Sequence, residues 1–225
     1  MDSVQLIKIK EEILSDNTEL GNEIRGRMRA SGTFFINLMA SPGAGKTSLL
    51  VQTIRRMKVD VRMGVIEGDI ESMVDSQKIQ DEGVRAVQIE TGGACHLDAA
   101  MVQPALATLN LADYDLLVVE NIGNLVCPAE FDIGETKKVM LLSIPEGHDK
   151  ILKYPLMFTV CDVLIINKMD YLDSSDFDLQ QLKATMAKLN PKARIFEMSC
   201  KTGQGVDAWC AWLKEEIAAW KQQAG

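Results

Sequence analysis

Apolar residues along the chain fall into short runs that are separated by amphipathic stretches. Runs rich in aliphatic residues predict strands at 34–40, 61–66, 84–89, 116–119, 139–144, 163–166 and 195–198. Apolar residues at helical spacing predict helices at 4–29, 47–57, 73–82, 97–109, 179–189 and 206–220. Strands that alternate with helices predict an α/β fold of three layers, with a mostly parallel sheet and helices on both faces. In such a fold, a ligand site is expected where the strands end.

Composition narrows the class of protein. The 225 residues suit one α/β domain at 34–225, preceded by a helical extension at 1–33. The net charge of −8 argues against nucleic acid or an anionic membrane as a partner, because phosphate groups require clustered Lys and Arg. No apolar run has the length of a membrane span, and the charged N-terminus is unlike a signal peptide. We therefore expect a cytoplasmic protein whose five cysteines are reduced thiols.

The segment A-S-P-G-A-G-K-T at 40–47 follows a predicted strand and opens a predicted helix. This context is typical of a Walker A phosphate loop and favours that interpretation over a glycine-rich turn that binds nothing. It predicts the three-layer P-loop NTPase fold. Ala40 departs from the usual first glycine, but alanine fits there if its φ is negative. Lys46 would reach the β- and γ-phosphates, and the Thr47 hydroxyl would ligate Mg²⁺. The residues expected to hold the nucleotide phosphates are Gly43, Ala44, Gly45, Lys46, Thr47 and Ser48.

A second motif, N-K-M-D at 167–170, follows the predicted strand 163–166. The Asp170 carboxylate can accept hydrogen bonds from two guanine nitrogens, a pair of donors that adenine lacks. The stem of Lys168 can lie over the base, and Asn167 can tie this segment to the phosphate loop. A solvated turn is the alternative, and it is less favoured downstream of a Walker A loop. Three residues after the last predicted strand resemble an element that contacts the guanine oxygen: Ser199, Cys200 and Lys201.

Acidic residues near the ends of two other predicted strands are candidates for Mg²⁺ binding and catalysis. Asp69, in E-G-D, is expected to bind Mg²⁺ directly or through water, and Glu120 is expected to hold an Mg²⁺-bound water. Asp75 is a candidate for positioning the attacking water, and the Gly123 amide for sensing the γ-phosphate. For each carboxylate, a helix cap or a solvated charge is the alternative. Because no glutamine is placed to orient water, we expect slow GTP hydrolysis that dimerisation or a partner accelerates.

Cysteine and histidine indicate a second metal site. Cys95 and His96 lie before a predicted helix, and Cys127 follows the strand 116–119, so all three are expected at the same edge of the sheet. Thiolate and imidazole ligands suit Zn²⁺ or Ni²⁺. Taken alone, an adjacent Cys-His pair is more often a small buried thiol beside a capping histidine. The other cysteines are not expected to bind metal, and His148 is expected to be solvated. These cysteines are Cys161, Cys200 and Cys210.

Together these motifs resemble the SIMIBI class of GTPases, most closely the HypB-type hydrogenase nickel-incorporation GTPases. The resemblance runs from about residue 34 to the last helix and includes S-P-G-A-G-K-T, E-G-D-I, T-G-G-A-C-H-L-D, V-E-N-I-G-N-L-V-C-P-A-E-F-D-I-G, S-I-P-E-G and N-K-M-D. It implies that Cys95, His96 and Cys127 form a metal site shared across a homodimer promoted by GTP. It also implies nickel delivery to the [NiFe]-hydrogenase large subunit with a HypA-type nickel-binding accessory protein. Lys153 matches a lysine near the dimer seam of this family.

Some relatives of this type carry a cysteine motif or a histidine-rich stretch at the N-terminus, but residues 1–33 contain neither Cys nor His. Nickel storage there is therefore not expected. Two other functions stay open: a GTPase chaperone for urease or another metalloenzyme, and a metal-binding adaptor with weak GTPase activity. Urease-type relatives carry Cys-Pro-His, whereas here Cys95-His96 is separate from Cys127-Pro128, which favours the hydrogenase branch. The choice between Ni²⁺ and Zn²⁺ also stays open, because both ions accept these ligands.

Overall fold

The computed structural model describes residues 9–69 and 74–224. Its centre is a seven-stranded sheet of order β3-β2-β4-β1-β5-β6-β7, in which every neighbouring pair of strands is parallel. Parallel neighbours require crossover connections, and the helices supply them. The strands are β1 (Phe34–Ala40), β2 (Met63–Asp69), β3 (Arg85–Glu90), β4 (Leu116–Glu120), β5 (Lys137–Ser143), β6 (Val163–Asn167) and β7 (Arg194–Glu197).

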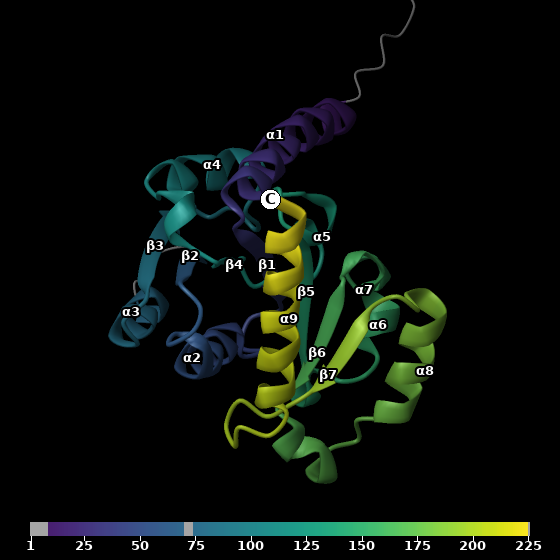
Figure 1. The fold of residues 1–225 in the computed structure, drawn as a ribbon. Helices are drawn as coiled ribbons and strands as arrows, with labels where there is room; N and C mark the ends of the chain where they lie inside the picture. The colour runs from purple at the N-terminus through teal and green to yellow at the C-terminus, as the bar shows by residue number, and fades with distance from the viewer. Residues whose placement is uncertain (1–8, 70–73, 225) are drawn as a thin grey trace, which may run out of the picture.

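The helices form two layers, one on each face of this sheet (Figure 1). One face packs against α2 (Lys46–Met57), α3 (Val74–Asp81) and α9 (Val206–Ala224). The opposite face is covered in two parts, by α1 and α4 over the β2–β4 side and by α5, α7 and α8 over the β5–β6 side. The bounds of the remaining helices are α1 (Ile9–Ser31), α4 (Ala99–Ala107), α5 (Cys127–Glu130), α6 (Lys150–Lys153), α7 (Pro155–Val160) and α8 (Leu179–Leu189).

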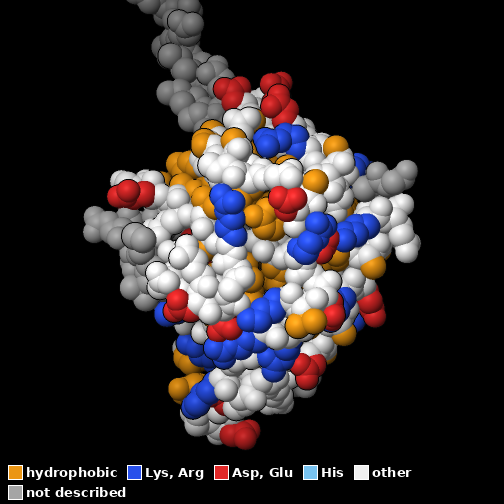
Figure 2. Space-filling model, turned by 60° about the vertical axis from the view of Figure 1, so that its left-hand side comes forward, with side chains coloured by type: hydrophobic (Ala, Val, Ile, Leu, Met, Phe, Trp, Pro, Cys, Tyr) orange, Lys and Arg blue, Asp and Glu red, His pale blue; other side chains and the backbone are white. Residues whose placement is uncertain are grey.

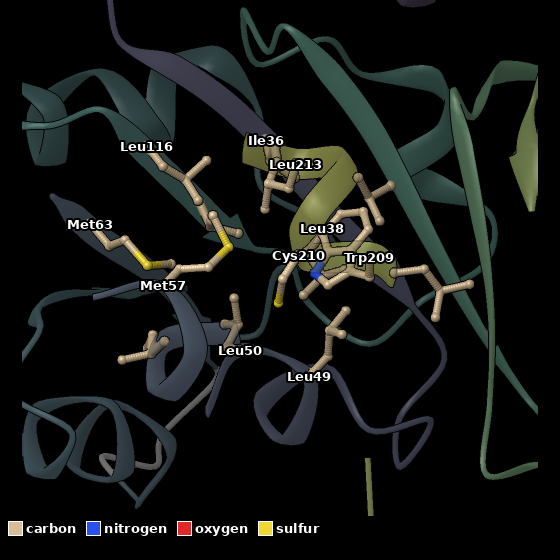
Figure 3. Packing of buried hydrophobic residues seen from close by; sticks show 14 of the residues in the cluster. Ile36, Leu38, Leu49, Leu50, Met57, Met63, Leu116, Trp209, Cys210 and Leu213 are labelled. Carbon is tan, nitrogen blue, oxygen red and sulfur yellow. The ribbon is translucent and has the colours of Figure 1, made fainter. Parts of the chain in front are cut away.

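Figure 3 shows how α9 packs onto the sheet and onto α2. Trp209 lies among aliphatic side chains of β1 and α2, including Leu38 and Leu49, and is 3% exposed. Its indole Nε1 donates to the Thr53 hydroxyl on α2 at 3.0 Å, so burial leaves no unpaired indole donor. This contact fixes the helix that begins at the phosphate loop against the C-terminal helix.

Helix α1 packs against the hydrophobic core on one face of the sheet. Ile24 and Met28 are fully buried beside residues of α4 and β4. Asn17 joins the start of α4 to the loop between α5 and β5, because its Oδ1 accepts from the Ala99 amide at 2.9 Å and its Nδ2 donates to the Asp132 carbonyl at 2.7 Å. Gly134 has φ +82° and packs so closely on α1 that a Cβ there would lie 2.6 Å from Ile24. A domain boundary at residue 33 stays a prediction.

The predicted three-layer α/β fold is confirmed, and the sheet is parallel throughout the described residues. The predicted first helix began at residue 4, but residues 4–8 lie outside the described part of the chain. Short helices at α5, α6 and α7 were not predicted, since four to six residues are too few to show a helical period. In the described residues, no helix is both long and apolar enough for a membrane span.

Candidate functional site

The phosphate loop connects β1 to α2 at the edge of the sheet where the strands end. Gly43 and Gly45 have φ of +75° and +108°, values that side-chain-bearing residues rarely adopt. The backbone turns through these glycines and enters α2 at Lys46, so the free amides and positive end of that helix face the loop. The Lys46 side chain is 9% exposed. This arrangement can hold a phosphate chain.

The N-K-M-D segment is bonded directly to the phosphate loop. Asn167 Nδ2 donates to the Ala44 carbonyl at 3.0 Å, and Asn167 Oδ1 accepts from the Cys200 amide at 3.1 Å. Lys168 Nζ donates to the Gly43 carbonyl at 2.7 Å, and Lys168 itself adopts a left-handed φ of +61°. Asn167 therefore joins three segments that are far apart in the sequence.

A cavity of 310 Å³ opens beside this junction. Asp170 lies on its wall, where its Oδ1 accepts from the Ser199 hydroxyl at 2.6 Å and its Oδ2 lies 3.8 Å from Lys201 Nζ. The Ser199 hydrogen bond lowers the pKa of Asp170, so the carboxyl is ionised at neutral pH. A charged acceptor in a cavity of this size can read two donors on a flat base. The cavity is lined by Gly45, Ser48, Pro145, Asn167, Lys168, Asp170, Tyr171, Cys200 and Lys201.

Carboxylates and a hydroxyl meet beside the phosphate loop. Glu120 Oε1 accepts from the Thr47 hydroxyl at 3.0 Å and lies 3.9 Å from Lys46 Nζ. Glu67 lies opposite Glu120 in the pairing of β2 with β4, and both residues are at most 5% exposed. These hard oxygen donors fit Mg²⁺, which prefers one or two carboxylates together with substrate phosphates. Sequence reasoning missed Glu67, although the E-G-D motif contains it.

The side chains of Asp69 and Asp75 lie outside the described part of the structure. Asp69 is the last residue of β2. Its backbone therefore lies at the edge of the sheet where the phosphate loop also lies. Their roles stay predictions.

Glu146, within the S-I-P-E-G segment at 143–147, and Lys153, which follows that segment, contribute differently. Glu146 accepts from the Ser143 amide at 2.8 Å and hydrogen-bonds the Ser41 hydroxyl, so it holds the end of β5 against the phosphate loop. Sequence reasoning missed this residue, although Ser143 and Glu146 have the spacing of a capping box. Lys153 forms an exposed ion pair with Asp149 at 2.5 Å, and this pair raises the pKa of Lys153.

The three predicted metal ligands lie close together in the structure. The Sγ atoms of Cys95 and Cys127 are 3.1 Å apart, and Cys95 Sγ lies 3.5 Å from His96 Nδ1. One ligand atom from each of the three residues lies within 4.8 Å of the others. The hydrogen bond from Cys95 raises the pKa of the Cys127 thiol. Two thiols and an imidazole at this separation can converge on one Zn²⁺ or Ni²⁺ ion.

The His96 ring is oriented by packing. It stacks at a tilt of 31° on Phe131, with the ring centroids 4.0 Å apart. Burial lowers the pKa of His96, which favours the neutral imidazole that a metal requires. Asn121 supports the adjoining backbone, because its Oδ1 accepts from the Leu97 amide at 3.0 Å and its Nδ2 donates to Asn37 at 3.0 Å.

The other cysteines and the second histidine lie elsewhere. Burial raises the pKa of Cys161 to about 12, and that of Cys200 and Cys210 to about 11, so these thiols are protonated at neutral pH. His148 was expected to be solvated; its side chain is partly exposed, but it also has a hydrogen-bond partner. Its Nδ1 accepts from the Asp178 amide at 3.0 Å, and its ring packs edge-on to a phenylalanine. Asp178 lies 30 residues from His148 along the chain, so the sequence carried no sign of this hydrogen bond.

Figure 2 shows Lys and Arg side chains gathered on one face of the molecule, with acidic side chains among them. Two arginines near the end of α2 are paired: Arg55 Nε lies 2.8 Å from Glu82, and Arg56 Nε lies 2.6 Å from Asp207. These guanidinium groups are therefore engaged within the protein.

The comparisons with known proteins agree with this geometry. The family model described as "CobW/HypB/UreG, nucleotide-binding domain" matches residues 34–197. The chain belongs to this family. Among curated relatives, a hydrogenase maturation factor HypB of Rhizobium leguminosarum is 44% identical over 97% of this chain and 73% of its own length. A hydrogenase/urease maturation factor HypB of Helicobacter pylori (strain J99) is 41% identical over 93% of this chain and 88% of its own length.

Solved structures place the chain within the HypB branch of the CobW/HypB/UreG family. HypB from Helicobacter pylori in complex with nickel has a TM-score of 0.87 and 38% identity, and the match covers 91% of this chain and 96% of that one. HypB from Archaeoglobus fulgidus has a TM-score of 0.85 and 38% identity, covering 90% and 99%. The predicted family and P-loop NTPase fold are thereby confirmed.

Proposed function

We propose that this chain is a GTP-hydrolysing metallochaperone, which binds Ni²⁺ or Zn²⁺ and assists nickel insertion into [NiFe]-hydrogenase. The observation that carries the proposal is the meeting of Cys95, His96 and Cys127 within 4.8 Å, next to the loop that leaves the Glu120 strand. The metal site and the nucleotide site therefore lie next to the same segment, the loop that follows the Glu120 strand. The names of the HypB relatives, which are hydrogenase maturation factors, support the same function.

In this proposal, GTP lies along the phosphate loop with its base in the 310 Å³ cavity. Asp170 accepts from the guanine N1–H and N2–H₂ groups, and the Lys168 stem covers the base. Lys46 and the amides of the phosphate loop neutralise the phosphates, while Thr47 would hold Mg²⁺. That ion would offset charge on the phosphates during hydrolysis.

The remaining roles in hydrolysis belong to acidic residues. Glu120 and Asp69 would hold Mg²⁺ or its water, and Asp75 would position the attacking water. Turnover is slow, because no glutamine is assigned to orient that water.

Two copies of the chain would complete the metal site. Three protein ligands leave a tetrahedral ion one ligand short, and a thiolate from a two-fold-related copy can supply the fourth. GTP favours the dimer, and hydrolysis reopens it with metal release. Lys153 lies at the seam of this dimer. The further partners are a HypA-type nickel-binding protein and the hydrogenase large subunit, in the cytoplasm and without nucleic acid or membrane.

The test is rescue of hydrogenase activity in cells that lack their own HypB protein. Lys46→Ala and Cys95→Ser are each expected to abolish rescue, and purified Cys95→Ser is expected to keep GTP hydrolysis. Cys210→Ser is the matched control, since that thiol is buried far along the chain on α9. Full rescue by Lys46→Ala would instead favour a metal-binding adaptor with a vestigial nucleotide site.

A second target is urease, because the Helicobacter pylori relative is named a hydrogenase/urease maturation factor. The same variants assayed for urease activity in a urease-maturation mutant distinguish the two targets. Rescue of urease alone would assign this chain to urease.

A further inference from the structure

The loop between β4 and α5 joins the phosphate loop to the metal ligands. Its backbone lies on the phosphate-loop strand, because the Asn124 amide donates to the Ala40 carbonyl at 2.9 Å. Gly123 packs directly on Pro42, so that a Cβ added to Gly123 would lie 2.8 Å from the Pro42 nitrogen. A shift of the phosphate loop must therefore move this loop as well, because close-packed backbone transmits displacement.

The side chain of the same Asn124 reaches both metal-ligand segments. Its Nδ2 donates to the Cys95 carbonyl at 3.0 Å, and its Oδ1 accepts from the Val126 amide at 2.8 Å. One residue thus contacts the phosphate loop through its backbone and both cysteine segments through its amide group.

Asn124 is also placed where such a role can be tested without unfolding the protein. It is half-buried, whereas Asn121 is 1% exposed and has three buried hydrogen bonds. Loss of Asn121 would leave buried backbone amides without acceptors and would destabilise the whole fold.

We propose that Asn124 is the positioning residue that sets the separation of Cys95 and Cys127 according to the nucleotide in the phosphate loop. This inference rests on the proposed coupling of GTP and metal. A nucleotide that displaces Ala40 or Pro42 shifts the Asn124 backbone, and the Asn124 amide group then moves the Cys95 carbonyl relative to Cys127. For this reason, the affinity for metal differs between the two nucleotide states. Thermodynamic linkage then requires bound metal to change the affinity for nucleotide by the same factor.

The test compares metal affinity in two nucleotide states. Zn²⁺ and Ni²⁺ are titrated by chelator competition into full-length protein saturated with GDP or with a non-hydrolysable GTP analogue. The quantity is the ratio of the two dissociation constants, for which allosteric coupling of about 5- to 150-fold is typical. The ratio cancels any direct effect of a substitution on the ligands, because each variant is compared with itself.

Two variants separate positioning from folding. Asn124→Ala removes both side-chain bonds, whereas Asn124→Ser keeps an acceptor for the Val126 amide and loses the reach to Cys95. Both are expected to bring the ratio to within about twofold of one while metal still binds. Asn110→Ala, which loses only an exposed bond to Asp113, is the control and is expected to keep the parent ratio.

The outcomes are distinct. A parent ratio well above or below one that persists in Asn124→Ala and Asn124→Ser would overturn the role of Asn124 and leave the proposed function standing. A parent ratio of one would overturn the proposed coupling and this inference with it.

Discussion

Substituting Gly45 by alanine tests how the phosphate loop and the N-K-M-D segment fit together. Gly45 has φ +108°, and a Cβ there would lie 2.5 Å from Asn167 Nδ2. The added methyl group must displace the Asn167 side chain, which donates to the Ala44 carbonyl at 3.0 Å. Two costs therefore add: backbone strain and the loss of a buried hydrogen bond.

The magnitude follows from these two costs. An L-residue in the left-handed region costs about 1–2 kcal/mol, and a lost hydrogen bond that leaves a buried carbonyl unpaired costs about 1–3 kcal/mol. We expect Gly45→Ala to lower the free energy of unfolding by about 2–5 kcal/mol. Gly43→Ala is the matched control, because Gly43 has φ +75° but no atom within 4 Å of its added Cβ. Its expected cost is about 1–2 kcal/mol from strain alone.

The assay is urea unfolding of nucleotide-free protein followed by far-ultraviolet circular dichroism. A double-mutant cycle with Asn167→Ala isolates the clash, since truncation of Asn167 removes the atom that the new methyl group meets. The two substitutions should therefore be non-additive by at least about 1 kcal/mol. Equal losses for Gly43→Ala and Gly45→Ala, or strict additivity with Asn167→Ala, would refute the reasoning.

Three further predictions concern the base, the metal and the fold. Asp170→Ala should weaken GTP binding relative to ATP by about 1.5–3 kcal/mol, the range for a hydrogen bond to a charged group, and competition against a fluorescent GDP analogue measures this. Cys95→Ser should lose most Zn²⁺ binding in a chelator titration, while Cys161→Ser, at a buried thiol, should keep it. Asp115→Asn should lower the free energy of unfolding at pH 7 by about 1–3 kcal/mol, because Asp115 accepts from Arg62 at 2.7 Å and from Lys221 at 2.5 Å.

The Asp115 prediction carries a pH dependence of defined sign. Burial alone would raise the pKa of Asp115, but its bonds to Arg62 and Lys221 hold that pKa well below the usual range. A carboxyl with a depressed folded-state pKa contributes stability that is present above its unfolded pKa of about 3.9 and is lost as pH falls below it. The difference in stability between parent and Asp115→Asn should therefore shrink as pH falls from about 5 to 2. A constant difference over that range would contradict this explanation.

The sequence was informative wherever periodicity or spacing carries the structural signal. The helix 179–189 and the strand 34–40 agree with α8 and β1 at both ends, because helical spacing of apolar residues marks the first and a nearly continuous apolar run marks the second. Asn167 was expected to tie its segment to the phosphate loop, and its hydrogen bond to Ala44 confirms this contact. In each of these cases the prediction rests on residues that are neighbours in the sequence, or on a motif whose geometry is fixed.

The contacts that sequence reasoning missed depend on residues brought together by folding. Glu146 reaches Ser41 across 105 positions, and Asn124 reaches Cys95 across 29. Neither pair shows a spacing that a motif could specify, since the distance along the chain is set by the intervening elements. Glu67 differs, because its place beside Glu120 follows from the register of two parallel strands, which no single strand reveals.

The affinity for a non-hydrolysable GTP analogue, measured by calorimetry with and without one equivalent of Ni²⁺, tests the central claim most directly. The account predicts that Ni²⁺ changes this affinity, and by the same factor as the analogue changes Ni²⁺ affinity relative to nucleotide-free protein. Identical affinity for the analogue with and without Ni²⁺ would contradict the account, because the phosphate loop and the Cys95–His96–Cys127 site would then act independently.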